Sequence, residues 1–269
     1  MGNKKYNDLT FADNFMFAKV MQQSKSLCKH LIEIIIGKKI KEICYLDAEK
    51  TINPSYESKG IRLDVCVIDV DGNVYDLEMQ VRNTKNIHKR ERYYHGVIVS
   101  DHLKKGEDYI NIPDVTVIFI CLEDILEHDE PVYKIDKVAK GYDSSYEYED
   151  GEKTIILNAD CSWFPDNELG RFLRFLKTNI PTDDFTNDLL KAVEIVKLNK
   201  EWEAEYMTLE SMLDDKIQLG KSLGDARRLV KCVKDLMEKK QYSLKDACET
   251  FDVSVEEYND ALDLVESVE

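Results

Sequence analysis

The chain lacks a long apolar run, an apolar leader and closely spaced cysteines, and each absence excludes a class of protein. Its longest apolar stretch, Ile32 to Ile36, is interrupted by Glu33 and is far shorter than the roughly 20 residues that span a bilayer. No basic segment followed by an apolar segment opens the chain, so we expect a cytoplasmic protein without a membrane partner. No CxxC pair suggests a zinc site, and we expect the seven cysteines to be reduced: Cys28, Cys44, Cys66, Cys121, Cys161, Cys232 and Cys248.

The composition is that of a folded protein, and its acidic character is unevenly distributed. Hydrophobic residues make up 43% of the 269 residues and charged residues 33%, which is typical of a globular protein. The net charge is −16, yet residues 1–110 contain 18 basic and 16 acidic residues, whereas the remaining residues contain 19 and 37. The acidic remainder limits non-specific binding to nucleic acid, and the first part is the one that can contact phosphates.

Two acidic residues, Asp64 and Glu78, lie on segments that read as successive β-strands joined by an Asp71-Gly72 turn. Side chains alternate along a strand, so each acid belongs to a face opposite an apolar set. Carboxylates on neighbouring strands can together bind a hard divalent cation. The second strand presents its polar face through three residues: Asp76, Glu78 and Gln80.

The length of the connecting loop decides whether these polar residues share a face. A two-residue loop would place Asp64 opposite Met79, whereas a three-residue loop over 70–72 places it opposite Glu78. Because a one-residue slip exchanges the faces, only the three-residue loop keeps both apolar sets together. We therefore predict that loop, with Gly72 at positive φ and with Asp64, Glu78 and Gln80 together. The alternative is that both acids are solvated positions of an edge hairpin.

The order of the remaining elements predicts an α/β sandwich with a mixed sheet, followed by helices. Residues 115–122 form a continuous apolar run, as expected for a strand buried on both faces. Pro181 marks a boundary, and from about Asp183 the pattern is helical, with a break at Gly220 or Gly224. Two short helices capped by Ser243 and Ser254 follow, and their acidic faces favour protein packing over a major-groove role. The expected core elements are helices opening at Thr10, at 26–36, 87–103 and 166–177, and strands at 40–46, 61–70, 73–81, 115–122, 133–138 and 154–158.

Basic residues follow the second strand on the predicted helix at 87–103. Lys85, Lys89, Arg90 and Arg92 lie just downstream of Gln80 and could contact phosphates. The alternative is an ordinary solvated helix face.

Six blocks in order carry a resemblance to a known family. They are FMFAKVM at 15–21, KGIRLDV at 59–65, EMQ at 78–80, KRERYY at 89–94, GEDY at 106–109 and VIFIC at 117–121. Together they resemble the PD-(D/E)XK nuclease family transposases, a group related to the recombination-promoting nucleases of bacteria. The resemblance runs from about residue 9 to 198 and implies a restriction-endonuclease-like core, a mixed central β-sheet flanked by helices, with an all-helical C-terminal tail.

The family pattern implies that Asp64, Glu78 and Gln80 are catalytic and that Asp64 and Glu78 bind Mg²⁺, for which Mn²⁺ can substitute. Gln80 stands where the wider superfamily has a lysine, so an amide replaces a positive charge there. On the first helices, Glu33 is a further expected metal ligand by analogy with related nucleases.

DNA contacts are expected from Arg90 and Tyr94, one turn apart, and from Lys89 and Arg92. His95 could act as a base, but packing or exposure to solvent is the simpler interpretation.

The resemblance implies a nuclease-like domain at 1–181 and a helical extension at 182–269, ending in a small helix-turn-helix-like module from about 222. It implies a Mg²⁺-dependent deoxyribonuclease that hydrolyses phosphodiester bonds in recombination, mobile elements or defence, without a small-molecule cofactor. A homodimer is expected if both strands are cut. The alternative function is a weak or inactive nuclease fold that acts as a protein-interaction module.

Overall fold

The computed structural model describes residues 4–53 and 59–267, which form two compact units. The first reaches Trp202 and contains the sheet, and the second begins at Glu203 and is helical. Among the described residues, no helix has the length and apolar character needed to cross a membrane.

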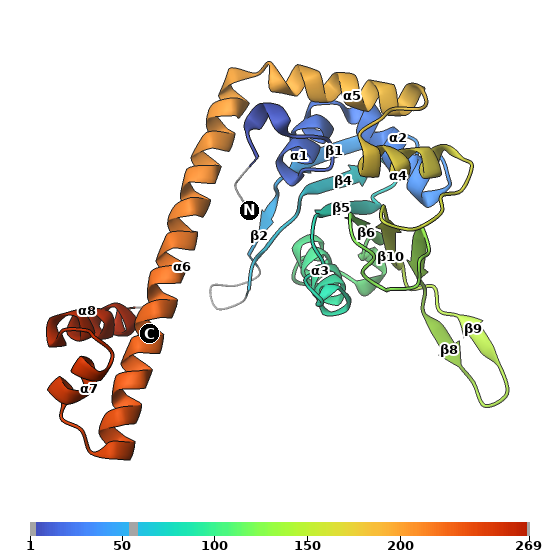
Figure 1. The fold of residues 1–269 in the computed structure, drawn as a ribbon. Helices are drawn as coiled ribbons and strands as arrows, with labels where there is room; N and C mark the ends of the chain where they lie inside the picture. Colours follow the sequence, from blue (N-terminus) through green and yellow to red (C-terminus); the bar gives the residue numbers. More distant parts are fainter. Residues whose placement is uncertain (1–3, 54–58, 268–269) are drawn as a thin grey trace. The chain divides into compact units, whose positions relative to one another are not determined.

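A six-stranded mixed sheet forms the centre of the first unit, with the order β1-β4-β5-β6-β10-β7 (Figure 1). The pairs β1/β4, β4/β5 and β10/β7 are antiparallel, whereas β6 runs parallel to both β5 and β10. Every residue of β5 and β6 is buried, which confirms a central position and excludes an edge hairpin. The strands are β1 (Ile43–Ala48), β4 (Val65–Asp69), β5 (Val74–Gln80), β6 (Val115–Cys121), β7 (Val132–Ile135) and β10 (Glu152–Asn158).

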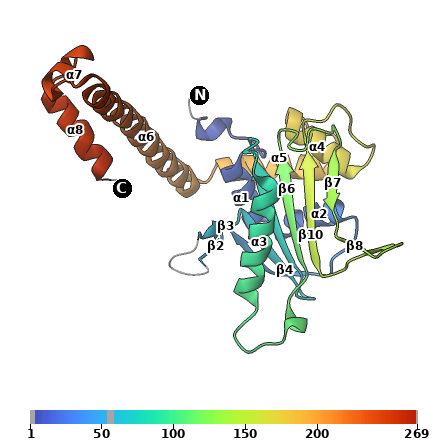
Figure 2. The same ribbon diagram turned by 90° about the horizontal axis from the view of Figure 1, so that it is seen from below.

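Helices cover both faces of this sheet (Figure 2). Helix α3 (Ile87–His102) packs on one face, where Tyr94, Val97 and Ile98 contact buried residues of β4 and β6. The other face is covered by α1 (Asn14–Gln23) and α2 (Lys25–Ile36), together with α4 (Glu168–Thr178) and α5 (Asp184–Lys197). The predicted fold class, a restriction-endonuclease-like α/β sandwich, is confirmed.

The loop between β4 and β5 has the predicted odd length. Asp69 N–H donates to the carbonyl of Asn73, which leaves residues 70–72 as the loop, and Gly72 has φ +87°. The Asp69 carboxylate accepts the N–H groups of Asp71 and Asn73, at 2.9 and 3.0 Å, and also the Tyr75 hydroxyl at 3.1 Å. One buried carboxylate therefore closes the loop and fixes the register of the hairpin.

The first unit extends beyond the boundary expected at residue 181. Helix α5 begins at a capping box made by Asp183 and Thr186, and it packs on α1, α2 and α4. The Tyr6 hydroxyl donates to the carbonyl of Val196 at 2.7 Å, and the His30 ring stacks on Phe185 at 4.5 Å between ring centroids. These contacts make α5 part of the sheet unit rather than of the tail.

The second unit contains most of α6 (Lys200–Lys240), with α7 (Leu244–Thr250) and α8 (Val255–Glu266). The caps at Ser243 and Ser254 are present as predicted. The predicted break is wrong, since α6 continues through Gly220 and Gly224. Each glycine within a helix lowers helix stability by about 1 kcal/mol relative to alanine. A helix of 41 residues tolerates this loss because its formation is cooperative.

Two short pairings were not predicted. Strand β2 (Thr51–Ile52) pairs with β3 (Ile61–Arg62), and β8 (Val138–Lys140) pairs with β9 (Ser145–Glu147). All six residues of the β8/β9 hairpin are exposed, so no apolar alternation marks it in the sequence.

Candidate active site

The site lies where the ladder between β4 and β5 ends. The last paired residues are Val65 and Leu77, so Asp64 and Glu78 occupy the next cross-strand position. Glu78 Oε1 accepts the N–H of Asp64 at 2.9 Å, and Asp64 Oδ2 accepts the N–H of Met79 at 2.9 Å. The two carboxylates thus accept backbone N–H groups, as backbone carbonyl groups do in a regular β-ladder. This exchange positions both acids on the face that α3 covers.

Arg90 on α3 lies against this pair. Its Nη2 is 2.5 Å from Glu78 Oε2, and its Nη1 donates to Gln80 Oε1 at 2.7 Å. Its Nε donates to the Tyr94 hydroxyl at 3.0 Å, and the guanidinium lies over the Tyr94 ring. The Gln80 amide nitrogen donates to the carbonyl of Met79 at 3.2 Å, which fixes its orientation. A cation supplied by the helix therefore contacts both polar residues at the end of β5.

A third acid lies beneath the pair. Asp76 is fully buried on the same face of β5, and neither of its carboxylate oxygens has a hydrogen-bond partner. Burial and the neighbouring charges of Glu78 and Asp64 raise the pKa of Asp76 well above its usual value. The surroundings of Asp76 therefore favour its protonated, neutral form.

The other two acids also resist ionisation. Burial raises the pKa of Glu78 to about 8, and the charge of Asp64 adds to the effect while Arg90 opposes it. Burial raises the pKa of Asp64 to about 6, against the lowering effect of the Met79 N–H and of Arg90. If all three acids were ionised, their negative charge would exceed the positive charge of Arg90, so a bound divalent cation would favour their ionised forms.

The donor set fits a hard divalent metal ion. Asp64 and Glu78 offer carboxylate oxygens with free lone pairs, and the unpartnered oxygens of Asp76 lie among the same charges. Mg²⁺ and Mn²⁺ prefer such oxygen ligands and keep several waters.

Comparison with protein-family models gives one match, to the PD-(D/E)XK nuclease family transposases, over residues 5–158. This is more than half of the chain. The chain belongs to this family. No curated protein and no solved structure matches it significantly.

The family match covers the hairpin, α3 and the sheet through β10, but not α4 to α8. Within it, the structure brings together Asp64, Glu78, Gln80, Arg90 and Tyr94, all of which the sequence marked. Arg90 and the buried Tyr94 face the acids, so the Arg90 guanidinium is bonded to Glu78 and Gln80 rather than exposed on the outer side of the helix.

Glu33 does not join the PD-(D/E)XK site. Its Oε2 lies 2.7 Å from Lys39 Nζ, and its Oε1 accepts the N–H of Ile40 at 3.0 Å. These bonds join the end of α2 to the segment that leads into β1, and they lower the pKa of Glu33 despite the opposing effect of burial. We therefore leave Glu33 out of the metal-binding set.

A groove of about 430 Å³ opens beside α3, and Arg90 and Tyr94 are among the residues that line it. Lys89 lies in it and is exposed, whereas Arg92 is exposed on α3 but does not line it. Lys59 and Arg62 form the opposite wall, and the Tyr93 hydroxyl bonds the carbonyl of Lys59 across the groove. The sequence marked KGIRLDV only as a family block, and its two basic residues were the signal for this second wall.

Proposed function

We propose that the chain is a metal-dependent DNA endonuclease of the PD-(D/E)XK type, with Mg²⁺ or Mn²⁺ held by Asp64 and Glu78. The observation that carries this proposal is the reciprocal bonding of Asp64 and Glu78 at the end of the β4/β5 ladder, beside Arg90. The word transposase in the family description supports a role in recombination or mobile elements, and defence is a further possibility of the same proposal.

When bound, the metal ion would lower the pKa of a coordinated water and neutralise charge on the scissile phosphate. The side chains of the site supply the rest. Asp64 and Glu78 orient the ion through carboxylates whose positions are fixed by backbone N–H groups. Gln80 can accept a hydrogen bond from a nucleophilic water, and Arg90 can stabilise negative charge that develops on phosphate oxygens.

The groove between α3 and residues 59–62 is the proposed path of the DNA backbone. Lys59, Arg62 and Lys89 place three cations along it, and Arg90 connects it to the acids. Phosphate contacts of this kind give affinity without sequence preference, and they weaken as salt is added. Arg92 is the fourth proposed contact, on the exposed side of the helix.

The test is cleavage of supercoiled plasmid DNA with Mg²⁺ or Mn²⁺ by the parent, by Asp64→Asn and by Asp143→Asn. Asp143 is an exposed residue away from the acids and serves as the matched control. We expect cleavage that requires metal, that persists in the control and that is lost in Asp64→Asn. Cleavage that survives in Asp64→Asn would reject this site. A folded protein that neither cleaves nor binds metal would favour a partner-binding role for the fold.

A further inference from the structure

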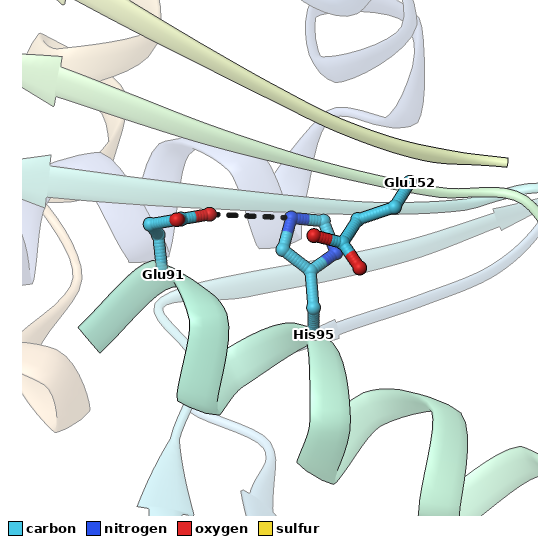
Figure 3. A group of neighbouring side chains, drawn as sticks. All are labelled: Glu91, His95 and Glu152. Atoms are coloured by element: carbon cyan, nitrogen blue, oxygen red, sulfur yellow. Dashed lines mark ion pairs between the residues drawn. The ribbon is translucent and has the colours of Figure 1, made fainter. Parts of the chain in front are cut away.

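A second group of metal-ligand side chains joins α3 to β10. Glu91 and His95 lie one turn apart on α3, and Glu152 begins β10. One ligand atom from each of the three lies within 4.8 Å of the other two. Figure 3 shows the two carboxylates approaching the imidazole ring of His95 from different sides. None of these residues belongs to the PD-(D/E)XK site.

The hydrogen bonds of His95 define its tautomer. Thr154 Oγ1 donates its single proton to Glu91 Oε2 at 2.9 Å, because a carboxylate can only accept. His95 Nε2 lies 2.9 Å from the same Thr154 oxygen and must therefore carry a proton and donate it. Nδ1 is consequently left with a lone pair.

That lone pair has no partner. His95 is only 2% exposed, and its Nδ1 is a buried atom without a hydrogen bond. Burial lowers the pKa of His95, with Lys137 acting in the same direction and Glu152 and Asp150 opposing, so the ring stays neutral at pH 7. A buried acceptor beside carboxylates, which are also acceptors, is satisfied by a cation.

We propose that His95 Nδ1 and Glu152 form a second metal site, which takes a divalent transition metal ion and Zn²⁺ in particular. Imidazole nitrogen and carboxylate oxygen are both Zn²⁺ ligands, with water in the remaining positions, and Mg²⁺ avoids imidazole. Glu91 lies on the other side of the ring, 3.9 Å from Nε2, and is not a ligand of the ion. The chain of bonds from Nε2–H to Thr154 to Glu91 holds the ring with Nδ1 as the ligand.

The site would tie α3 to β10 at His95, five residues after Arg90 on the same helix. Since Arg90 reaches Glu78 from α3, a metal ion at His95 and Glu152 would help to hold the arginine against the acids. The ion would act on stability and on the position of Arg90, not on the phosphate.

Replacing Lys137 gives a test in which the affinity for Zn²⁺ is expected to rise. Its Nζ lies 2.9 Å from Glu152 and 2.8 Å from Asp150, so it competes with a metal ion for the Glu152 carboxylate. Lys137→Met should therefore tighten Zn²⁺ binding, whereas His95→Gln should weaken it by at least about 100-fold.

The experiment uses the full chain carrying Asp64→Asn and Glu78→Gln, stripped of metal, so that the proposed nuclease site cannot contribute. Zn²⁺ is titrated by calorimetry, Co²⁺ by visible absorption, and the melting temperature is followed with each. We expect one equivalent of Zn²⁺ and a rise of about 5 °C in Tm. The exposed His88, on the same helix, gives the control His88→Gln, which should bind as the parent background does.

Absence of stoichiometric Zn²⁺ binding in the parent background would overturn the proposal. So would binding that His95→Gln and Glu152→Gln both leave unchanged. Glu152 is partly exposed, with 33% of its side chain accessible, so its variant folds even if the buried histidine cannot be replaced. Because the nuclease acids are already removed, failure here leaves the proposed nuclease function untouched.

A different observation concerns the exposed middle of α6, in which every residue from 211 to 222 is exposed. Leu209, Leu213 and Ile217 form an apolar stripe along one side of the helix. At 100° per residue, Val230 and Val233, which pack against α7 and α8, lie on the opposite side. The stripe is therefore not the surface that the α7/α8 module covers.

Charge along α6 is strongly segregated. Residues 200–215 contain six acidic residues and one lysine, whereas residues 216–240 contain eight basic and three acidic residues. We infer that α6 pairs in antiparallel fashion with α6 of a second copy of the chain. That arrangement places each acidic half against the partner's basic half, and a centre midway between Leu213 and Ile217 buries the apolar stripes against each other.

Sedimentation of the full chain at micromolar concentration tests this pairing. The parent should be dimeric at low salt and dissociate as salt rises, because opposite charges face each other. Leu213→Lys combined with Ile217→Lys should weaken dimerisation about 100-fold or more. Met212→Lys, an exposed change on another side of the helix, is the control and should remain dimeric. A monomeric parent, or a stripe variant as dimeric as the control, would overturn the inference.

Discussion

Arg90 Nη2 lies 2.5 Å from Glu78 Oε2, although the two residues come from a helix and a strand that are separated by a loop. The same guanidinium bonds Gln80, which occupies the strand position where the wider superfamily has lysine. The positive charge missing from the strand is therefore delivered from α3. Arginine suits this role because its planar fork can contact two acceptors at once.

Removing this cation should damage both the site and the fold. Arg90→Gln leaves Glu78 buried without its ion pair, so we expect a loss of about 2–4 kcal/mol in the free energy of unfolding at pH 8. Cleavage should fall by about 100-fold or more. Urea unfolding and plasmid cleavage measure the two effects. Arg90→Lys should retain part of each, whereas Arg92→Gln, on the exposed side of α3, should change stability by less than about 0.5 kcal/mol.

Restoring the superfamily's lysine should impair this protein. Gln80→Lys removes the acceptor for Arg90 Nη1 and puts a second cation next to the guanidinium. We expect lower stability and cleavage reduced by about 10-fold or more. In Gln80→Lys combined with Arg90→Gln, the lysine replaces the guanidinium as the cation beside Glu78. The cleavage activity of this double variant should exceed that of Arg90→Gln alone. Higher activity in Gln80→Lys alone would show that Arg90 does not supply the charge.

Stability and metal affinity should depend on pH in opposite directions. The pKa of Glu78 is raised to about 8 and that of Asp64 to about 6, so between about pH 4 and 8 the folded protein binds more protons than the unfolded chain. The metal-free protein therefore loses stability as pH rises, by up to about 1.4 kcal/mol per pH unit for each proton. Mg²⁺ competes with those protons, so its affinity should increase over the same range.

Urea unfolding at pH 5, 6.5 and 8, with and without Mg²⁺, measures both trends. Glu78→Gln should reduce the decline seen without metal, to which Asp64 and Asp76 also contribute, and should remove most of the Mg²⁺ effect. If the parent and Glu78→Gln depend on pH identically, Glu78 is not held protonated by its surroundings.

The sheet unit should fold and cleave without the tail. A chain ending at Trp202 keeps α5 and its contacts with α1, including the bond from Tyr6 to Val196. We expect metal-dependent cleavage and a monomer in sedimentation. A chain ending at residue 181 lacks α5, so the apolar surface that Phe185 and Leu189 cover becomes exposed. Its free energy of unfolding should fall by several kcal/mol. Equal stability of the two truncated chains would place the boundary before α5.

Most of the fold could be predicted because short-range patterns decide it. Alternation of apolar residues with Asp64 and Glu78 required an odd loop, and the structure has that loop. The direction in which the Arg90 side chain points could not be predicted from such patterns. A basic residue on an amphipathic helix is usually solvated, and only the three-dimensional position of buried acids shows that this one turns inward.

Other features escaped prediction for related reasons. Asp76 lies in the same alternating set as Glu78 and Gln80, but the sequence does not show that it has no partner. The continuity of α6 through Gly220 and Gly224 depends on helix cooperativity, which outweighs a local preference for a break. The pairing of His95 with Glu152 joins residues that are far apart in the chain.

The Asp69 carboxylate fixes the number of residues in the loop of the hairpin. Val70 and Asp71 are exposed and can vary freely in identity, but the number of residues between Asp69 and Asn73 cannot change by one. Natural length variation in this turn should therefore occur in pairs of residues, since a one-residue slip of β5 would turn Glu78 toward α1 and Met79 toward Arg90. A surface deletion far from any ligand can thus abolish the site while every active-site residue remains in the sequence.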